Sequence, residues 1–238
     1  MERLLAVLLM AAMLWATTAQ AGWFDRGVKG SGDMVTQNRE VGQFDRVETA
    51  GSWDVTVVVG QEQSLKLTFD DNIIDLIRTE VDDGTLEIYS EESFSTKRRS
   101  RVEITVPTLR EVRSSGSGDI SVDRLEAERF DFDLSGSGDF VLSGKVGEMT
   151  VRLKGSGDGT LRGEAEILDV KISGSGDIDA ADMKAKEAFV RVSGSGNVNV
   201  NCTDLFDGRV SGSGDIAYSG KPADVNTSVS GSGDIRRR

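Results

Sequence analysis

An aspartate recurs at nearly even spacing through the second half of the chain, and regularly spaced carboxylates could bind a metal ion or cleave a glycoside. Each one ends a Gly-Ser-Gly-Asp motif, in which Asn197 once replaces the aspartate. Successive motifs lie 20, 19, 19, 20, 18 and 19 residues apart. A repeat of fixed period builds stacked units, so the motif predicts a column of like side chains. The carboxylates of this column belong to Asp119, Asp139, Asp158, Asp177, Asp215 and Asp234.

Calcium binding is the first chemistry that this aspartate column could serve. Stacked strands lie about 4.8 Å apart, and two like charges at about that distance repel by roughly 1 kcal/mol in bulk water. A calcium ion would relieve this repulsion. The motif shares a Gly-x-Gly-Asp core with the nonapeptide calcium repeat, but it has twice the period and lacks the second glycine-rich half-turn. We therefore expect the aspartates to hydrogen-bond backbone in tight turns, with calcium as the alternative.

Catalysis is disfavoured by the composition. The chain has no histidine, which excludes Ser-His-Asp and Cys-His nucleophiles and removes the commonest metal ligand. Paired carboxylates about 5–10 Å apart could hydrolyse glycosides, but a repeated pair lacks the two different environments that this chemistry needs. A polysaccharide lyase would need Lys or Arg beside a carboxylate cluster, and we expect no concentration of these cations within the repeats. We predict no catalytic residues and no cofactor other than the alternative calcium.

The unit from Asp139 to Gly157 indicates which elements carry the motif. Phe140 and Leu142 alternate with polar positions, and a second alternation runs from Met149 to Leu153 after a glycine-containing turn. The pattern predicts two strands in each unit, both closed by glycine. Nineteen residues are too few for a strand, a helix and two turns. Each unit is therefore predicted to be one coil of an all-β parallel solenoid.

The alternation continues through the motif itself. If Leu134 points inward, Gly136 and Gly138 share its face, and the residues between them point outward. Glycine would be needed because the wall bends or the coil is narrow there, leaving no room for a Cβ. The stacked coils would then carry three outward columns, two of serine and one of aspartate.

Residues 1–21 are predicted to be a secretory signal peptide. Leu4 to Trp15 is an apolar run too short to span a bilayer, and Ala19-Gln20-Ala21 fits a cleavage site, so the mature chain would begin at Gly22. The alternative is an N-terminal membrane anchor. No later segment is apolar enough to cross a membrane, so we expect an exported protein of the periplasm, the cell surface or the extracellular space.

Two kinds of sequence follow the signal peptide. Residues 22–113 lack the strict period and are predicted to form an irregular β portion that covers one end of the solenoid. Residues 114–238 are predicted to form the regular coils. Residues 22–238 would together make one continuous domain.

Four segments of the irregular portion carry specific expectations. Gly51-Ser52-Trp53-Asp54 looks like a degenerate copy of the motif. Residues 71–77 indicate one helical turn or a bent connection, and Asp82-Asp83-Gly84 predicts a hairpin turn. Residues 90–100 are polar and are predicted to form a solvated loop.

Charge and cysteine content limit the partners. A formal charge of −12 and a pI near 4.6 argue against binding to nucleic acid or anionic lipid. Cys202 is the single cysteine, so no intramolecular disulfide forms; we expect it to be semi-buried, with a reactive or intermolecular role as the alternative. Arg236-Arg237-Arg238 would discourage end-to-end stacking at the last coil, or else form a small basic contact patch.

The sequence resembles the GIN domain, a family labelled as an auto-transporter adhesin head domain. The resemblance covers roughly residues 28–236 and lies in Phe44-Asp45-Arg46-Val47, Asp71-Asn72-Ile73-Ile74-Asp75, Val106-Pro107-Thr108-Leu109, Tyr218-Ser219-Gly220-Lys221-Pro222 and the tandem motifs. It implies a right-handed, mainly β-helical protein of the bacterial cell envelope. No catalytic residues are carried over from the family.

Adhesin-like binding is the function that these observations favour. A rigid repeated face suits a repetitive ligand such as an envelope or host glycan, through many weak contacts; a protein partner is also considered. Trp23 and Trp53 could stack on sugars, or else fill the core. The alternatives are a structural envelope protein that self-assembles and a calcium-binding solenoid. The sequence does not set the oligomeric state.

Overall fold

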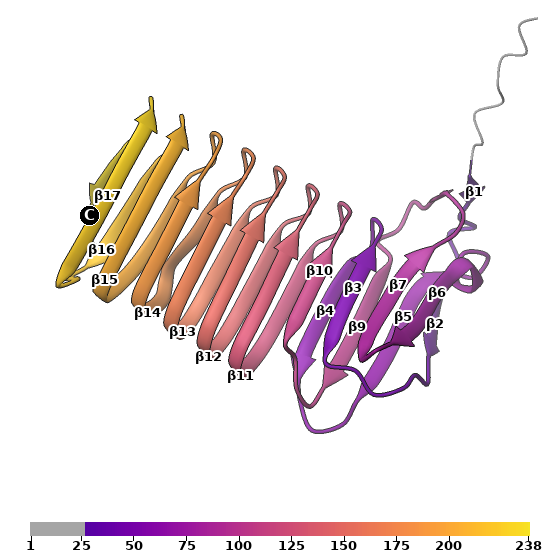
Figure 1. Cartoon of the computed structure of the whole chain (residues 1–238). Coiled ribbons are helices and arrows are strands. Elements are labelled where there is room, and N and C mark those ends of the chain that lie inside the picture. The colour runs from indigo at the N-terminus through magenta and orange to yellow at the C-terminus, as the bar shows by residue number, and fades with distance from the viewer. Residues whose placement is uncertain (1–26) are drawn as a thin grey trace, which may run out of the picture.

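The structure is a computed structural model and describes residues 27–238. Most of this chain forms a β-solenoid in which each coil pairs in parallel with its neighbours (Figure 1). The predicted all-β solenoid with coils of about 19 residues is confirmed, whereas the predicted signal peptide lies outside the described residues. The regular coils are formed by β11 (Ile120–Leu134), β12 (Phe140–Leu153), β13 (Gly159–Ile172), β14 (Ile178–Val192) and β15 (Val198–Gly212).

Each regular coil contains one long bent strand rather than the two short strands predicted. Each coil bends at two corners, the motif turn and a second corner inside the long strand. Parallel pairing continues through this second corner, where Leu125, Gly144 and Gly163 stack in register. Local bends form this corner, with φ of 58° at Arg124 and 120° at Gly163 and a register shift between Val122 and Leu125. Glycine there marks a bend in a continuous strand, because the next coil supplies hydrogen bonds on both sides of it.

The core consists of inward columns that run along the solenoid. Burying one large aliphatic side chain contributes about 1.5–3 kcal/mol, so the inward register is strongly fixed. One such column, in which each side chain is at most 2% exposed, is formed by Leu134, Leu153, Ile172, Val192 and Val210.

Cys202 belongs to this core and is fully buried rather than semi-buried. It stacks on Ala185 in the register of β14 and β15. Burial, with a smaller contribution from the Asp204 carboxylate, raises the pKa of the Cys202 thiol to about 11. The reactive thiolate is therefore scarce near neutral pH, which argues against the alternative of a reactive or intermolecular cysteine.

The N-terminal portion changes from parallel to antiparallel pairing and so ends the series of coils. β5 pairs antiparallel with β2 and β9, and β6 pairs antiparallel with β7. The predicted helical turn is present as η1 (Ile74–Leu76), and the predicted hairpin turn has positive φ at Asp83 and Gly84. The strands of this portion are β1 (Val28–Lys29), β2 (Met34–Asn38), β3 (Arg46–Ala50), β4 (Asp54–Val59), β5 (Ser64–Asp70), β6 (Ile77–Asp82), β7 (Thr85–Ser90), β8 (Phe94–Ser95), β9 (Arg101–Val106) and β10 (Glu111–Ser114).

The opposite end of the solenoid carries no comparable cover among residues 27–238. It is formed by β16 (Ile216–Gly220), β17 (Asp224–Gly231) and β18 (Ile235–Arg237). Among the described strands β17 pairs only with β15, and every residue of β17 is exposed.

The motif glycines are required for a different reason from the one expected. A Cβ at Gly157 would overlap the carbonyl oxygen of Gly138 in the preceding coil, and the same holds for Gly155 against Gly136. The missing space lies along the solenoid axis, between stacked turns, and not toward the interior. The predicted degenerate motif at residues 51–54 is stacked in the same way. A Cβ at Gly116 would overlap the carbonyl oxygen of Gly51, and a Cβ at Gly118 would overlap that of Trp53.

Replacing Gly157 with alanine should destabilise the protein by about 1–3 kcal/mol, because the added methyl group forces two stacked turns apart. In a chain of this size that corresponds to a fall in Tm of several degrees, at about 2–4 °C per kcal/mol. Thermal melting followed by circular dichroism measures it. The matched control is Ser156→Ala on the adjacent exposed residue, and an equal Tm for both variants would contradict this account of the glycines.

Candidate binding surface

The motif turns stack into a ridge along one side of the solenoid, visible as the row of loops in Figure 1. The carboxylates of Asp119, Asp139, Asp158, Asp177 and Asp215 each accept a hydrogen bond from the backbone N–H of the equivalent residue in the next coil. Asp139 Oδ1 lies 2.9 Å from Asp158 N, and Asp158 Oδ1 lies 2.9 Å from Asp177 N. The carboxylates therefore cap the turns.

Asn197 identifies the property that this position needs. The side-chain oxygen of Asn197 accepts a hydrogen bond from the backbone N–H of Asp215 at 3.0 Å. The backbone N–H of Asn197 donates to Asp177 Oδ1 at 2.7 Å. A neighbouring amide of the turn uses a backbone acceptor instead, since Ser156 N–H donates to the Gly136 carbonyl. The aspartate position requires a side-chain acceptor, which a neutral amide also provides.

Among residues 27–238, ion pairs to the aspartate column lie only near its ends. Arg99 lies 3.4 Å from Asp54 and 3.6 Å from Asp119, and Arg236 lies 4.0 Å from Asp215. No group of three carboxylate, thiol or imidazole side chains within residues 27–238 lies close enough to hold a metal ion. Calcium binding by Asp119, Asp139, Asp158, Asp177, Asp215 and Asp234 stays a prediction.

Two columns of serine hydroxyls lie beside the carboxylates, one of them interrupted by Lys154, and both are exposed as the alternation predicted. Within the described residues, the hydroxyls of Ser156, Ser175 and Ser195 make no hydrogen bond to the protein. The second serine of the motif thus recurs in successive coils, while Lys154 replaces the first serine in the coil of Ser156. The surface can offer hydrogen bonds repeatedly along a line, which suits a linear polymer.

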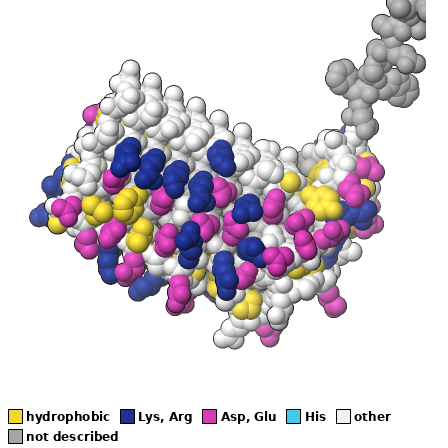
Figure 2. All heavy atoms as spheres, viewed as in Figure 1, with side chains coloured by type: hydrophobic (Ala, Val, Ile, Leu, Met, Phe, Trp, Pro, Cys, Tyr) yellow, Lys and Arg dark blue, Asp and Glu magenta, His cyan; other side chains and the backbone are white. Residues whose placement is uncertain are grey.

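A column of cations runs along the wall next to these serines, contrary to the expectation that the repeats concentrate no Lys or Arg. Arg152, Lys171, Arg191 and Arg209 occupy equivalent positions in four consecutive coils. Figure 2 shows a row of Lys and Arg side chains below the pale ridge. Residues about 19 apart form no cluster in the sequence, but a cation three positions before the first motif glycine recurs and could have predicted the row.

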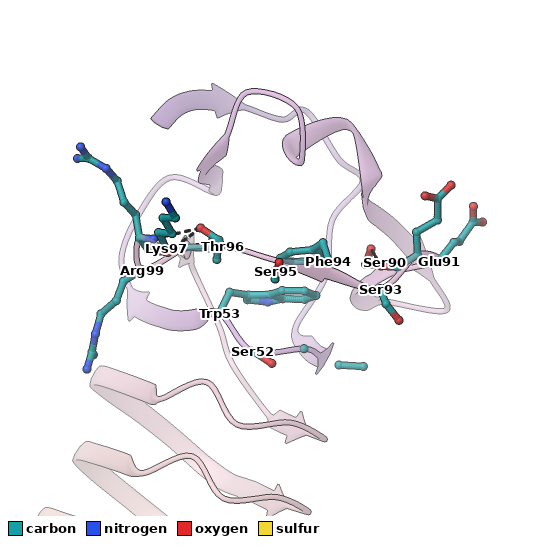
Figure 3. Close-up of a pocket in the computed structure, with 15 residues that line it drawn as sticks. Ser52, Trp53, Ser90, Glu91, Ser93, Phe94, Ser95, Thr96, Lys97 and Arg99 are labelled. Atoms are coloured by element: carbon teal, nitrogen blue, oxygen red, sulfur yellow. Dashed lines mark hydrogen bonds between the residues drawn. The ribbon is translucent and has the colours of Figure 1, made fainter. Parts of the chain in front are cut away.

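A cleft of about 700 Å³ lies at the covered end, between residues 50–53 and the loop of residues 90–100. Figure 3 shows Trp53 and Phe94 stacked in it, with Lys97 at one end and Glu91 at the other. The ring centroids lie 6.2 Å apart.

Trp53 fills the core and does not present its face for sugar stacking. It is 2% exposed, and its indole N–H donates to Thr49 Oγ1 at 3.0 Å. The predicted solvated loop is also structured in part, because Phe94 covers Trp53 and β8 pairs with β1. Trp23 lies outside the described residues.

Comparison with known proteins places the chain in a family. Residues 43–222 match the family described as "Putative auto-transporter adhesin, head GIN domain", so the chain belongs to that family. No protein of curated function matches it.

Solved structures share the same fold. A "putative adhesin" from Bacteroides fragilis is 26% identical, with a TM-score of 0.85 and coverage of 89% of this chain and 100% of that one. A "putative adhesin" from Parabacteroides merdae is 21% identical (TM-score 0.69, 89% and 98% coverage). A "putative lipid binding protein" from Parabacteroides distasonis is 24% identical (TM-score 0.73, 89% and 99% coverage). The family and the first relative support an adhesin-like module, and the other two support the fold alone.

Replacing Asp158 separates its acceptor role from its charge. Asp158→Ala should destabilise the protein by about 0.5–1.5 kcal/mol, because the N–H of Asp177 loses its partner. Asp158→Asn should stay within about 0.5 kcal/mol of the native protein, since Asn197 already performs this role. Denaturant unfolding measures both changes, and equal losses in the two variants would mean that the charge, not the acceptor, is required.

Proposed function

We propose that this chain is an exported, non-catalytic, adhesin-like module of the cell envelope that holds a linear glycan along its serine columns. The observation that supports this most directly is the row of exposed hydroxyls, without a hydrogen bond to the described chain, at Ser156, Ser175 and Ser195 in consecutive coils. A sugar polymer offers hydroxyls as donors and acceptors at regular spacing. Many weak hydrogen bonds in register sum to useful affinity through multivalency.

Non-catalytic function is supported by the sameness of the coils. The chain has no histidine, and the stacked aspartates share one role in capping the turns. The motif aspartates therefore share one environment, whereas acid and base catalysis needs two different ones. Export is supported by the predicted signal peptide and by the adhesin-like family; no helix within residues 27–238 is long and apolar enough to cross a membrane.

Co-sedimentation of residues 22–238 with isolated envelope polysaccharide tests the proposal. We expect saturable binding, and at least about tenfold weaker binding by Ser156→Ala/Ser175→Ala/Ser195→Ala, since each lost hydrogen bond contributes about 0.5–1.5 kcal/mol.

The matched control removes three hydroxyls that lie off the columns, in the variant Ser64→Ala/Thr160→Ala/Thr203→Ala. It should bind as the native protein does. Absence of native binding, or equal losses in both triple variants, would contradict glycan binding by the columns.

End-to-end assembly is a second candidate function, favoured by the open C-terminal end. Val225 and Val229 on β17 are 44% and 45% exposed. An uncovered strand edge with apolar side chains favours pairing with another chain, while Arg236, Arg237 and Arg238 oppose it by repulsion. Sedimentation velocity over a range of protein concentrations tests this assembly. A single species whose sedimentation coefficient does not change with concentration would rule it out.

Calcium binding by the aspartate column is tested by melting in calcium and in chelator. We expect equal Tm values, because one oxygen of every column carboxylate except that of Asp234 already accepts a backbone N–H. A calcium-induced rise in Tm that disappears in Asp139→Asn/Asp158→Asn/Asp177→Asn would instead assign the ion to the column.

A further inference from the structure

We infer that the wall beside the serine columns binds an acidic polysaccharide, whose carboxylate or sulfate groups meet one cation in each coil. We call Arg152, Lys171, Arg191 and Arg209 the cation column. The inference deepens the proposed function by naming the class of glycan, and it rests on that proposal. The cations, not the hydroxyls, would select the ligand.

The cation column projects farther from the wall than the carboxylates beside it. The side chains of Arg152, Lys171, Arg191 and Arg209 are 33%, 38%, 41% and 57% exposed. Those of the neighbouring acids are only 16–22% exposed, and these acids are Asp131, Asp133, Asp169 and Asp207. A ligand that approaches this wall meets the cations first, although the whole chain carries a charge of −12.

The recessed carboxylates hold the cations in place. Lys171 Nζ lies 2.6 Å from Asp169, and Arg209 lies 3.2 Å from Asp207. One oxygen of Asp169 and one of Asp207 are shielded from water and have no hydrogen-bond partner in the described chain. Ordered cations lose less conformational entropy on binding than free ones, which favours a polymer that needs all of them in register.

Hydroxyls continue the same surface. Two residues beyond Lys171 and Arg191 on the same outward face lie Ser173 and Ser193, both exposed. Alternate residues of a strand share a face, so the coils of Lys171, Arg191 and Arg209 each offer a cation and a hydroxyl side by side, while the coil of Arg152 has Lys154 at the hydroxyl position. This pairing matches an acidic sugar, which carries both an anionic group and hydroxyls.

A hollow of about 450 Å³ lies at one end of the cation column, where Asp133 stands between Arg113 and Arg152 in the register. Arg113, Arg152 and Lys154 contribute its cations, and Glu48 and Asp133 contribute its carboxylates. Arg152 lies 3.1 Å from Asp133, while Lys154 makes no ion pair within residues 27–238. The unpaired ammonium group gives a polymer an anchoring point beside the row.

The spacing of the cations favours a polysaccharide over nucleic acid. Coils lie about 4.8 Å apart, whereas duplex DNA carries one charge per about 1.7 Å of its axis. The dense phosphates would also meet the carboxylates next to the cation column. One anionic group per sugar is the sparser charge that a cation in each coil can match.

Binding of residues 22–238 to polygalacturonate tests the inference, with the fully methyl-esterified polymer as the uncharged probe. We expect binding to the acid that weakens with salt, and at least about tenfold weaker binding to the ester. The variant Arg152→Gln/Lys171→Gln/Arg191→Gln/Arg209→Gln should lose binding to a similar degree.

The matched control, Lys145→Gln/Arg162→Gln/Lys184→Gln/Lys186→Gln, removes the same charge from exposed positions at the second corner of the coils. It should bind polygalacturonate as the native chain does. Arg152→Lys/Arg191→Lys/Arg209→Lys keeps the charges and should retain binding; it covers the case in which the glutamine variant unfolds because its carboxylates lose their partners.

Three results would overturn the inference. They are equal binding to acid and ester, equal losses in the two glutamine variants, and binding to duplex DNA as tight as to polygalacturonate. Envelope polysaccharide that binds native chain and glutamine variant alike would leave the proposed function standing while the inference fails. The proposed function fails separately, either when no envelope polysaccharide binds or when the serine triple variant and its control lose binding equally.

Discussion

Close axial contact between stacked turns is the constraint on which the rest of this structure depends. At each motif the backbone of one coil lies against the carbonyl oxygens of the coil before it, which leaves no volume for a Cβ at Gly155 or Gly157. The same contact leaves the amide of Asp158 to be satisfied by a side chain, the carboxylate of Asp139. Glycine and an acceptor side chain therefore recur together, and the serines between them are free to face solvent.

The two ends of the solenoid differ because different elements lie against the first and the last of the stacked turns. Trp53 occupies the place of the second motif glycine in the turn of residues 51–54, and Phe94 stacks on its ring. Beyond it, antiparallel β5 and β6 end the parallel pairing. At the other end β17 remains fully exposed, so the two ends differ in their capacity to meet another molecule.

The sequence predicts what is local and periodic, and misses what stacking creates. The motif spacing predicted the coils, and Gly51-Ser52-Trp53-Asp54 was recognisable as a first turn because its glycine and aspartate keep the motif positions. The axial overlap at Gly157 could not be foreseen, because it depends on the twist of the turn and not on alternation. The cation column was missed since Arg152 and Lys171 lie 19 residues apart, and only the parallel register makes them neighbours.

Function on this scaffold would come from repetition and not from one special residue. A ligand bound by repeated cations and hydroxyls should gain affinity with each coil it reaches. Isothermal titration with oligogalacturonates of increasing length tests this most directly. The account predicts that affinity rises with each added sugar until the ligand spans the four-coil cation column, about 14 Å from first to last cation, and then levels off. Affinity that is already maximal for a disaccharide would contradict it and indicate a single local site.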